Sequence, residues 1–141
     1  MWLDDDKGFL LFTIGPVQSY IETARKTQDL YMGSYMISYL IFDAIESLLE
    51  YIPSEDIIFP SVDKNSLEIS SVASFPNRFL ALVPLAKAEE IANQLEDKVK
   101  SETKNIADYV MTKYKCDQKL FLKQKPWDFW EIYWVITSPK P

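Results

Sequence analysis

The sequence predicts a single α+β domain, residues 1–141, with a four-stranded sheet and helices mainly on one face. Three observations lead to this prediction. The chain has 141 residues and is 48% hydrophobic, which is enough for one core but not for two domains of ordinary size. Only three residues are glycine, which argues against a loop-rich or disordered chain. The apolar segments follow the order strand, helix, helix, strand, strand, helix, strand (βααββαβ).

The first strand and the first two helices are expected in the N-terminal half of the chain. Residues 9–15 are apolar and end in Gly-Pro, which predicts a buried strand, and Pro16 suits the first position of a helix. We expect Gly33 to end this helix and Ser34 to cap a second, deeply buried helix that runs to about Ile52. The first helix is expected to have an apolar face of Val17, Tyr20, Ile21 and Ala24 and a charged face of Glu22, Arg25, Lys26 and Asp29.

The remaining elements are expected in the C-terminal half. Residues 56–60 and 79–85 predict the second and third strands, and residues 130–137 predict the last. Residues 86–115 predict a long amphipathic helix, for which a kink near 101–103 is an open alternative. The apolar face of that helix is expected to consist of Ile91, Leu95, Val99, Ile106, Val110 and Tyr114.

This order of elements is that of ferredoxin-like domains, and also that of the palm of nucleotide cyclases and many polymerases. A catalytic palm needs carboxylates near the end of the first strand and in the next hairpin, to hold two metal ions. No acidic residue lies at 12–15, and the hairpin offers only Asp63 and Glu68. We therefore expect neither catalytic nor metal-binding residues. An independent Mg²⁺-dependent phosphotransferase or nuclease using these two acids is a minor alternative.

Composition excludes further classes of function. The formal charge of −6 disfavours autonomous binding to nucleic acid, because phosphate neutralisation needs clustered cations. The absence of histidine excludes His-ligated metals and Ser-His-Asp catalysis, and a single cysteine excludes an internal disulfide. No signal peptide and no membrane-spanning run are evident, so we expect a cytoplasmic protein without a membrane partner.

The segment GPVQSYIETARKTQDLYMGSYMISYL resembles the opening of the first palm in the large polymerase/cyclase-like subunit of type III-B CRISPR complexes, the Cmr type. Three later segments, IIFPS, SFPNRFLALVP and WEIYWVIT, are similar to further landmarks of that domain. The resemblance implies a non-catalytic palm that encloses ATP together with a second palm. In the family, that second palm carries a Gly-Gly-Asp-Asp motif and makes cyclic oligoadenylates after target RNA binds, so Mg²⁺ would be held by the partner palm.

The partners implied by the resemblance are the catalytic palm of the same or a split subunit and other CRISPR effector subunits. Guide and target RNA would be contacted only indirectly. The sequence contains no histidine-aspartate nuclease domain, no Cys-rich zinc module and no second palm. We therefore expect a fragment, an expressed domain or one part of a split subunit. A purely structural interaction module without nucleotide contact is the alternative function.

Three residues are predicted to bind the nucleotide. Ser34 matches a position that the family places near adenine, and an ordinary helix cap is the alternative. Gln18 lies in the first turn of the first helix, where backbone N–H groups favour a phosphate, and an exposed polar residue is the alternative. Gly15 directly precedes that helix and completes the predicted set.

Four further polar residues are predicted to contact phosphate or a partner. Arg25 and Lys26 could reach either one, and the alternative is a solvated helix face. Asn77 and Arg78 stand at the start of the third strand, where local turn chemistry is the alternative.

The aromatic residues near the C-terminus predict core packing on one face of the last strand. They are Trp127, Trp130, Tyr133 and Trp134. A base-stacking platform is the weaker alternative, for which nearby lysines would supply the positive charge. Those lysines are Lys119, Lys123 and Lys125.

Overall fold

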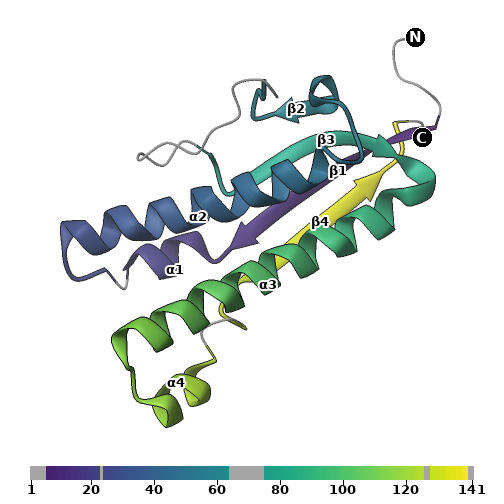
Figure 1. The fold of residues 1–141 in the computed structure, drawn as a ribbon. Coiled ribbons are helices and arrows are strands. Elements are labelled where there is room, and N and C mark those ends of the chain that lie inside the picture. The colour runs from purple at the N-terminus through teal and green to yellow at the C-terminus, as the bar shows by residue number, and fades with distance from the viewer. Residues whose placement is uncertain (1–5, 23, 64–74, 126–127, 140–141) are drawn as a thin grey trace.

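The computed structural model describes residues 6–22, 24–63, 75–125 and 128–139, which form an α+β fold with a four-stranded antiparallel sheet and two main helices (Figure 1). The strands lie in the order β2-β3-β1-β4. Their bounds are β1 Lys7–Gly15, β2 Ile57–Phe59, β3 Arg78–Pro84 and β4 Glu131–Thr137. All four strands predicted from the sequence are therefore confirmed, with the long strand β1 paired to both β3 and β4.

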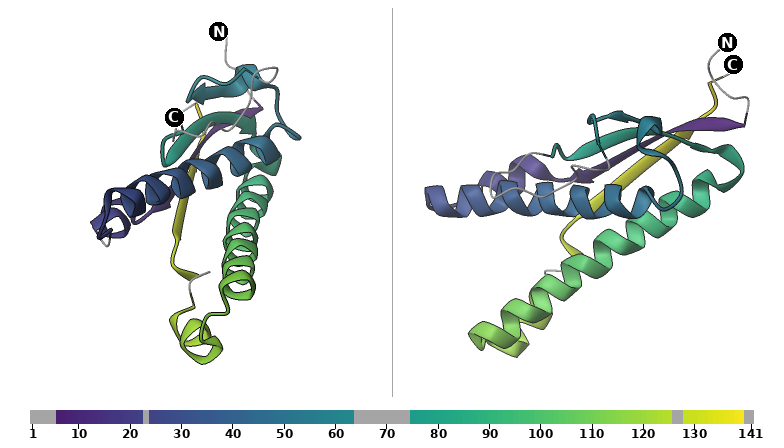
Figure 2. Two further views of the ribbon diagram at one scale, coloured as in Figure 1. Left: turned by 60° about the vertical axis from the view of Figure 1, so that its left-hand side comes forward. Right: turned by 45° about the horizontal axis from the view of Figure 1, so that its top comes forward.

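One face of the sheet carries the core. Alternate residues of β1 and β3 are buried there, and the rings of Phe12 and Phe79 stack with centroids 5.1 Å apart. The buried set from the two strands is Leu10, Phe12, Ile14, Phe79, Ala81 and Val83. Both main helices cover this face (Figure 2). Leu11, which points to the other face, is 40% exposed. The alternation of buried and exposed residues along β1 therefore indicates a sheet with one covered face.

The first helical region differs from its prediction. A short helix α1, Val17–Glu22, is followed by a connection and then by α2, Thr27–Leu48. The predicted break at Gly33 and cap at Ser34 are wrong, because both residues lie inside α2. One glycine in a helix interior costs only about 1 kcal/mol. The buried apolar face of the following turns outweighs that cost, and its members are Ile37, Leu40, Ile41, Ala44, Ile45 and Leu48.

Helix α2 is also less buried than predicted. Its C-terminal half packs on the sheet, whereas Leu30, Tyr31 and Met32 near its start are each more than 40% exposed. A helix of this length spans about 33 Å, and a seven-residue strand spans about 23 Å. The N-terminal turns of α2 therefore extend past the sheet, where α1 packs beside them (Figure 1).

Helix α3, Ala88–Tyr114, runs without interruption through 101–103. Its predicted apolar face is confirmed in the first half, where Ile91, Leu95 and Val99 are buried. It is wrong for the last turns, where Val110 and Tyr114 are 39% and 66% exposed. The reason is again length, since a 27-residue helix reaches about 40 Å and outruns the sheet.

Smaller elements complete the fold. The sequence did not lead us to expect α4, Gln118–Gln124, which folds back beside the end of α3 (Figure 1). Two short 3₁₀ helices, η1 Ser54–Asp56 and η3 Leu85–Lys87, flank β2 and α3. Within the described ranges, no helix combines the length and apolar character needed to cross a membrane.

The last strand alternates as predicted. Trp134 packs against the core and its indole N–H donates to a carboxylate oxygen of Glu96 at 3.0 Å, while Trp130, just before the strand, is 7% exposed. Tyr133 and Val135 lie on the other face and are about 60% exposed. Core packing is thus confirmed for the two tryptophans. The prediction for Trp127 falls outside the described residues.

Candidate functional site

The residues predicted to bind the nucleotide lie at the end of the sheet where β1 runs into α1. Figures 1 and 2 both show α1 beside the N-terminal half of α2 at this end of the molecule. β1 ends at Gly15, α1 carries Gln18, and α2 carries Ser34. The topology thus brings the three elements together, although each residue has different surroundings.

Gly15 and Gln18 leave open space next to the end of the strand. A Cβ atom built on Gly15 would meet nothing within 4 Å, so the backbone is accessible from that side. The Gln18 side chain is exposed, and it has no hydrogen-bond partner among the described residues. Because α1 has only six residues, its dipole is small, and the open side-chain amide is the better reason to expect a polar ligand.

Ser34 is half-buried in the second full turn of α2. The helix begins instead at Thr27, where the Asp29 carboxylate accepts hydrogen bonds from the backbone N–H groups of Arg25 and Lys26, each at 3.2 Å. Ser34 is therefore not an N-cap.

Arg25 and Lys26 lie in the connection between α1 and α2 and not on a helix face as predicted, because α1 ends at Glu22. Both side chains are exposed, and neither forms an ion pair within the described ranges. The connection lies at the tip of the molecule, beyond the edge of the sheet (Figure 1). The two cations are thus separated from Gly15 by the length of α1, about 9 Å.

Asn77 and Arg78 lie beside the end of β1. The Asn77 side-chain amide donates to the Ile14 carbonyl at 3.1 Å, and the Asn77 carbonyl accepts from the Ile14 N–H at 2.9 Å. Asn77 therefore joins the approach to β3 to the last residues of β1. Arg78 pairs in register with Thr13, and its side chain is exposed.

A polar cluster lies between α2 and α3. It was not expected, because the sequence predicted that the second helix is apolar on almost every face. Tyr39 donates to Glu102 at 2.9 Å, and Asp43 lies 3.8 Å from Lys98. Burial, followed by the hydrogen bond to Glu102, raises the pKa of Tyr39 to about 12. The signal available in the sequence was two acids, Asp43 and Glu46, in an otherwise apolar stretch.

The described residues contain no group of three acidic or cysteine side chains placed to hold a metal ion. Asp63 is exposed, and Glu68 lies outside the described residues.

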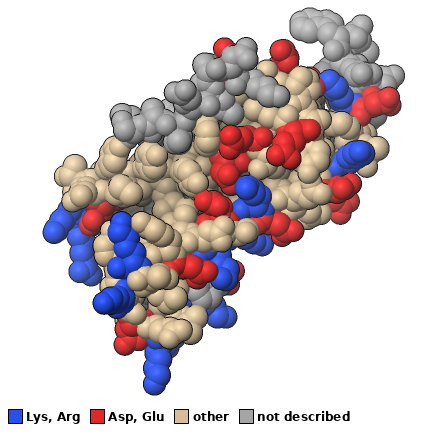
Figure 3. All heavy atoms as spheres, in the orientation of Figure 1, with Lys and Arg blue, Asp and Glu red and all other residues tan. Residues whose placement is uncertain are grey.

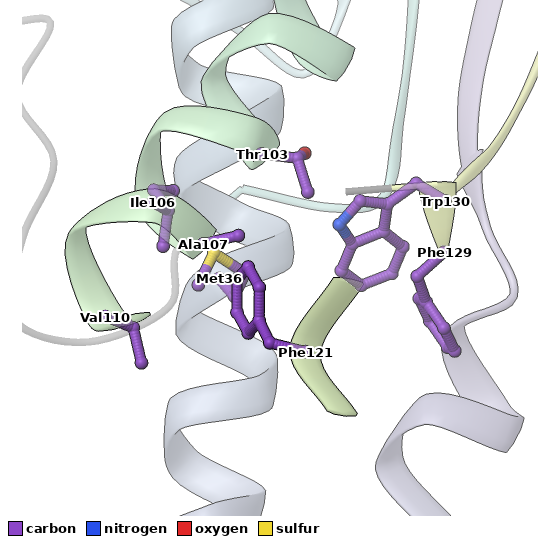
Figure 4. Close-up of a pocket in the computed structure, with 8 residues that line it drawn as sticks. All are labelled: Met36, Thr103, Ile106, Ala107, Val110, Phe121, Phe129 and Trp130. Carbon is purple, nitrogen blue, oxygen red and sulfur yellow. The ribbon is translucent and has the colours of Figure 1, made fainter. Parts of the chain in front are cut away.

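An apolar pocket lies between α2, α3 and α4, with a volume of about 310 Å³ (Figure 4). Its walls are almost wholly apolar. They are formed by Met36, Thr103, Ile106, Ala107, Val110, Phe121, Phe129 and Trp130. Sequence reasoning missed this pocket because it depends on α4 closing against the overhanging end of α3.

The geometry defines an α+β domain in which α1 and the N-terminal half of α2 lie beside the end of β1. Comparison with known proteins gives its family. Residues 9–108 match the family described as "CRISPR-associated protein Cmr2, N-terminal". Over 121 residues the chain is 31% identical to the CRISPR system Cmr subunit Cmr2 of Pyrococcus furiosus. That alignment covers 78% of this chain and 13% of the Pyrococcus protein. The chain belongs to the Cmr2 N-terminal family.

Proposed function

We propose that this chain is the non-catalytic, nucleotide-binding and scaffolding half of a two-palm subunit in a type III-B CRISPR effector complex. In this proposal the partner palm makes cyclic oligoadenylates for antiviral defence and holds the Mg²⁺ ions. Membership of the Cmr2 N-terminal family supports it. The antiparallel strand order β2-β3-β1-β4 supports the ferredoxin-like palm that the proposal requires.

The observation that carries the nucleotide proposal is the open position at Gly15 beside the exposed Gln18 amide. An amide can donate to or accept from a ribose, base or phosphate, and the accessible backbone allows close approach. Ser34, half-buried on the neighbouring helix, offers a hydroxyl to the adenine. These donors suit part of a nucleotide, and the metal ligands would come from the other palm.

Sharing the ligand between two palms predicts weak binding by this chain alone. If the partner palm supplies two hydrogen bonds of about 1 kcal/mol each, ATP should bind the chain at least about tenfold to thirtyfold more weakly than it binds the assembly. Isothermal titration of ATP into the chain, and into the chain reconstituted with the catalytic palm, measures the difference.

Variants of the assembly test the individual residues. We expect Gln18→Ala and Ser34→Ala each to weaken ATP binding by about fivefold, the effect of one hydrogen bond. Ser101→Ala, at an exposed position of α3, is the matched control and should bind as the unmodified chain does. If Gln18→Ala, Ser34→Ala and the control all bind ATP with the affinity of the unmodified chain, the nucleotide proposal fails at this site.

The second candidate is a structural module that docks other subunits and touches no nucleotide. The exposed Tyr133 and Val135 on the uncovered face of β4 favour it. A structure of the assembled complex with ATP distinguishes the two functions. The nucleotide proposal requires ligand density within hydrogen-bonding distance of Gln18 or Ser34, and the structural module predicts protein density on β4 with none at those residues.

A further inference from the structure

The end of the molecule formed by α4 and the last turns of α3 carries a local excess of positive charge. Residues 113–125 contain five lysines and one acid, Asp117, in a chain whose formal charge is −6. Figure 3 shows several basic side chains at this lower end, with a few acidic ones among them, whereas acidic side chains are more frequent in the middle of the visible face. The five cations are Lys113, Lys115, Lys119, Lys123 and Lys125.

These lysines differ from four lysines elsewhere in the chain, although Lys26 and Lys87 resemble them. Elsewhere Lys7, Lys98, Lys100 and Lys104 form ion pairs with Asp or Glu. Within the described part of the chain, none of the five lysines in 113–125 forms an ion pair. The Lys113 ammonium instead lies over the rings of Tyr109 and Tyr114, with centroids 5.3 and 5.6 Å away. Lys113 also donates to the Tyr109 hydroxyl at 3.0 Å, whereas the charges of the other four lysines are paired with no acid among the described residues.

The apolar pocket between α2, α3 and α4 opens at the same end. Figure 4 shows Phe121 of α4, Ala107 of α3 and Trp130 facing one another around it. The wall hydroxyl, that of Thr103, already donates to the Val99 carbonyl at 2.8 Å. Large apolar side chains of α3 and α4, one of which, Val110, lines the pocket, are 39–66% exposed. They are Tyr109, Val110, Tyr114, Leu120 and Leu122.

We propose that this pocket and the five lysines of residues 113–125, which we call the lysine rim, dock an acidic, amphipathic helix of a partner protein. One apolar side chain of that helix inserts between α3 and α4. Charge complementarity identifies the acidic face, because the rim is basic in an otherwise acidic chain. The apolar walls identify a protein side chain as the inserted group, since a nucleobase needs polar groups along its edges. A helix laid across the mouth would cover the exposed leucines and valine.

The proposal is independent of the nucleotide site. The pocket wall from α4 and the residues before β4 lie beyond residues 9–108, which carry the family match. The lysine rim and the end of β1 are built from different elements, so each can be altered without touching the other.

A direct test uses the full chain and a fluorescein-labelled helical peptide of about 16 residues, with leucines spaced three and four apart and glutamates elsewhere. Fluorescence anisotropy should show saturable binding, with a dissociation constant of about 10–100 μM, that weakens by about tenfold between about 50 and 500 mM salt. An oligouridine carrying the same label is the competing probe. Absence of saturable peptide binding, or tighter binding of the oligouridine, would overturn the proposal.

Filling the pocket tests the inserted side chain. Ala107→Met places a larger apolar group in the cavity and should reduce peptide affinity by at least about tenfold. Ser101→Met, at an exposed position on the same helix, is the control and should leave affinity unchanged. Circular dichroism verifies that both variants are folded. If the two variants bind the peptide with equal affinity, no peptide side chain inserts into the pocket.

Reversing one rim charge tests the electrostatic part without altering the core. Lys125→Glu should weaken peptide binding by about twofold to fivefold, the range for one exposed charge pair. Lys87→Glu is the matched control, because Lys87 is exposed and lies 20 residues, or about 30 Å of helix, from Ala107. If Lys125→Glu and Lys87→Glu change peptide affinity equally, the lysine rim does not contribute to binding.

Discussion

At the residue scale, Asp43 is a carboxylate placed in the interface between α2 and α3. Its Oδ2 atom is buried and has no hydrogen-bond partner among the described residues, and Lys98 lies 3.8 Å from its other oxygen. Burial raises the pKa of Asp43, with help from Glu102 and Glu46, whereas Lys98 lowers it. The folded chain therefore binds this proton more tightly than the unfolded chain does. The stability contributed by protonation is lost as the pH rises from the ordinary carboxyl pKa, about 4, through the raised folded value.

Replacing this carboxylate should stabilise the chain at neutral pH. We expect Asp43→Asn to raise the free energy of unfolding at about pH 7, because no charge is then buried, and to lose that advantage near pH 4, where Asp43 is protonated. Urea denaturation at the two pH values measures the difference. Glu89→Gln, at an exposed position of α3, is the control. An advantage that grows on acidification would contradict the assignment.

At the element scale, α4 is a seven-residue helix that closes one side of the apolar pocket. Its N-cap is Asp117, whose carboxylate accepts from the Leu120 N–H at 3.0 Å. Because so short a helix is not stable alone, the cap and the packing of Phe121 hold it in place. The sequence did not predict this helix, because seven residues give too little periodicity to distinguish a helix from a loop.

Removing the cap should loosen α4 selectively. Asp117→Ala is expected to destabilise the helix by about 1 kcal/mol, and Asp117→Asn, which can still cap, by much less. Amide hydrogen exchange should accelerate in residues 120–125 for the alanine variant, while β1 and β3 keep their protection. Uniform acceleration across the chain would show that α4 is not a separate unit.

At the scale of the whole molecule, one sheet has a helix-covered face and an uncovered face. β1 lies second from one edge and contributes to both, with Leu10 fully buried under the helices and Leu11 40% exposed on the other side. The two leucines are neighbours in one strand, so they differ only in the face that they occupy.

This pair allows a matched stability test. We expect Leu10→Ala to lower the free energy of unfolding by about 2–5 kcal/mol, through lost burial and a residual cavity, and Leu11→Ala by about 1 kcal/mol or less. Chemical denaturation of the two variants gives both values. Similar losses would mean that the second face is also covered in solution, as self-association of the chain would do.

The sequence by itself determined the four strands and their order along the chain, because short apolar runs and a Gly-Pro boundary are local signals. The tertiary structure decided their order in the sheet and that only one face of β1 and β3 is buried. Only the tertiary structure decided that α2 continues through Gly33, since a local glycine signal is weaker than the burial of the turns that follow. It also decided the hydrogen bonds of Asn77 with β1, and the pocket beneath α4. Both depend on where segments distant in sequence meet, and on helices longer than the sheet they cover, which no local pattern records.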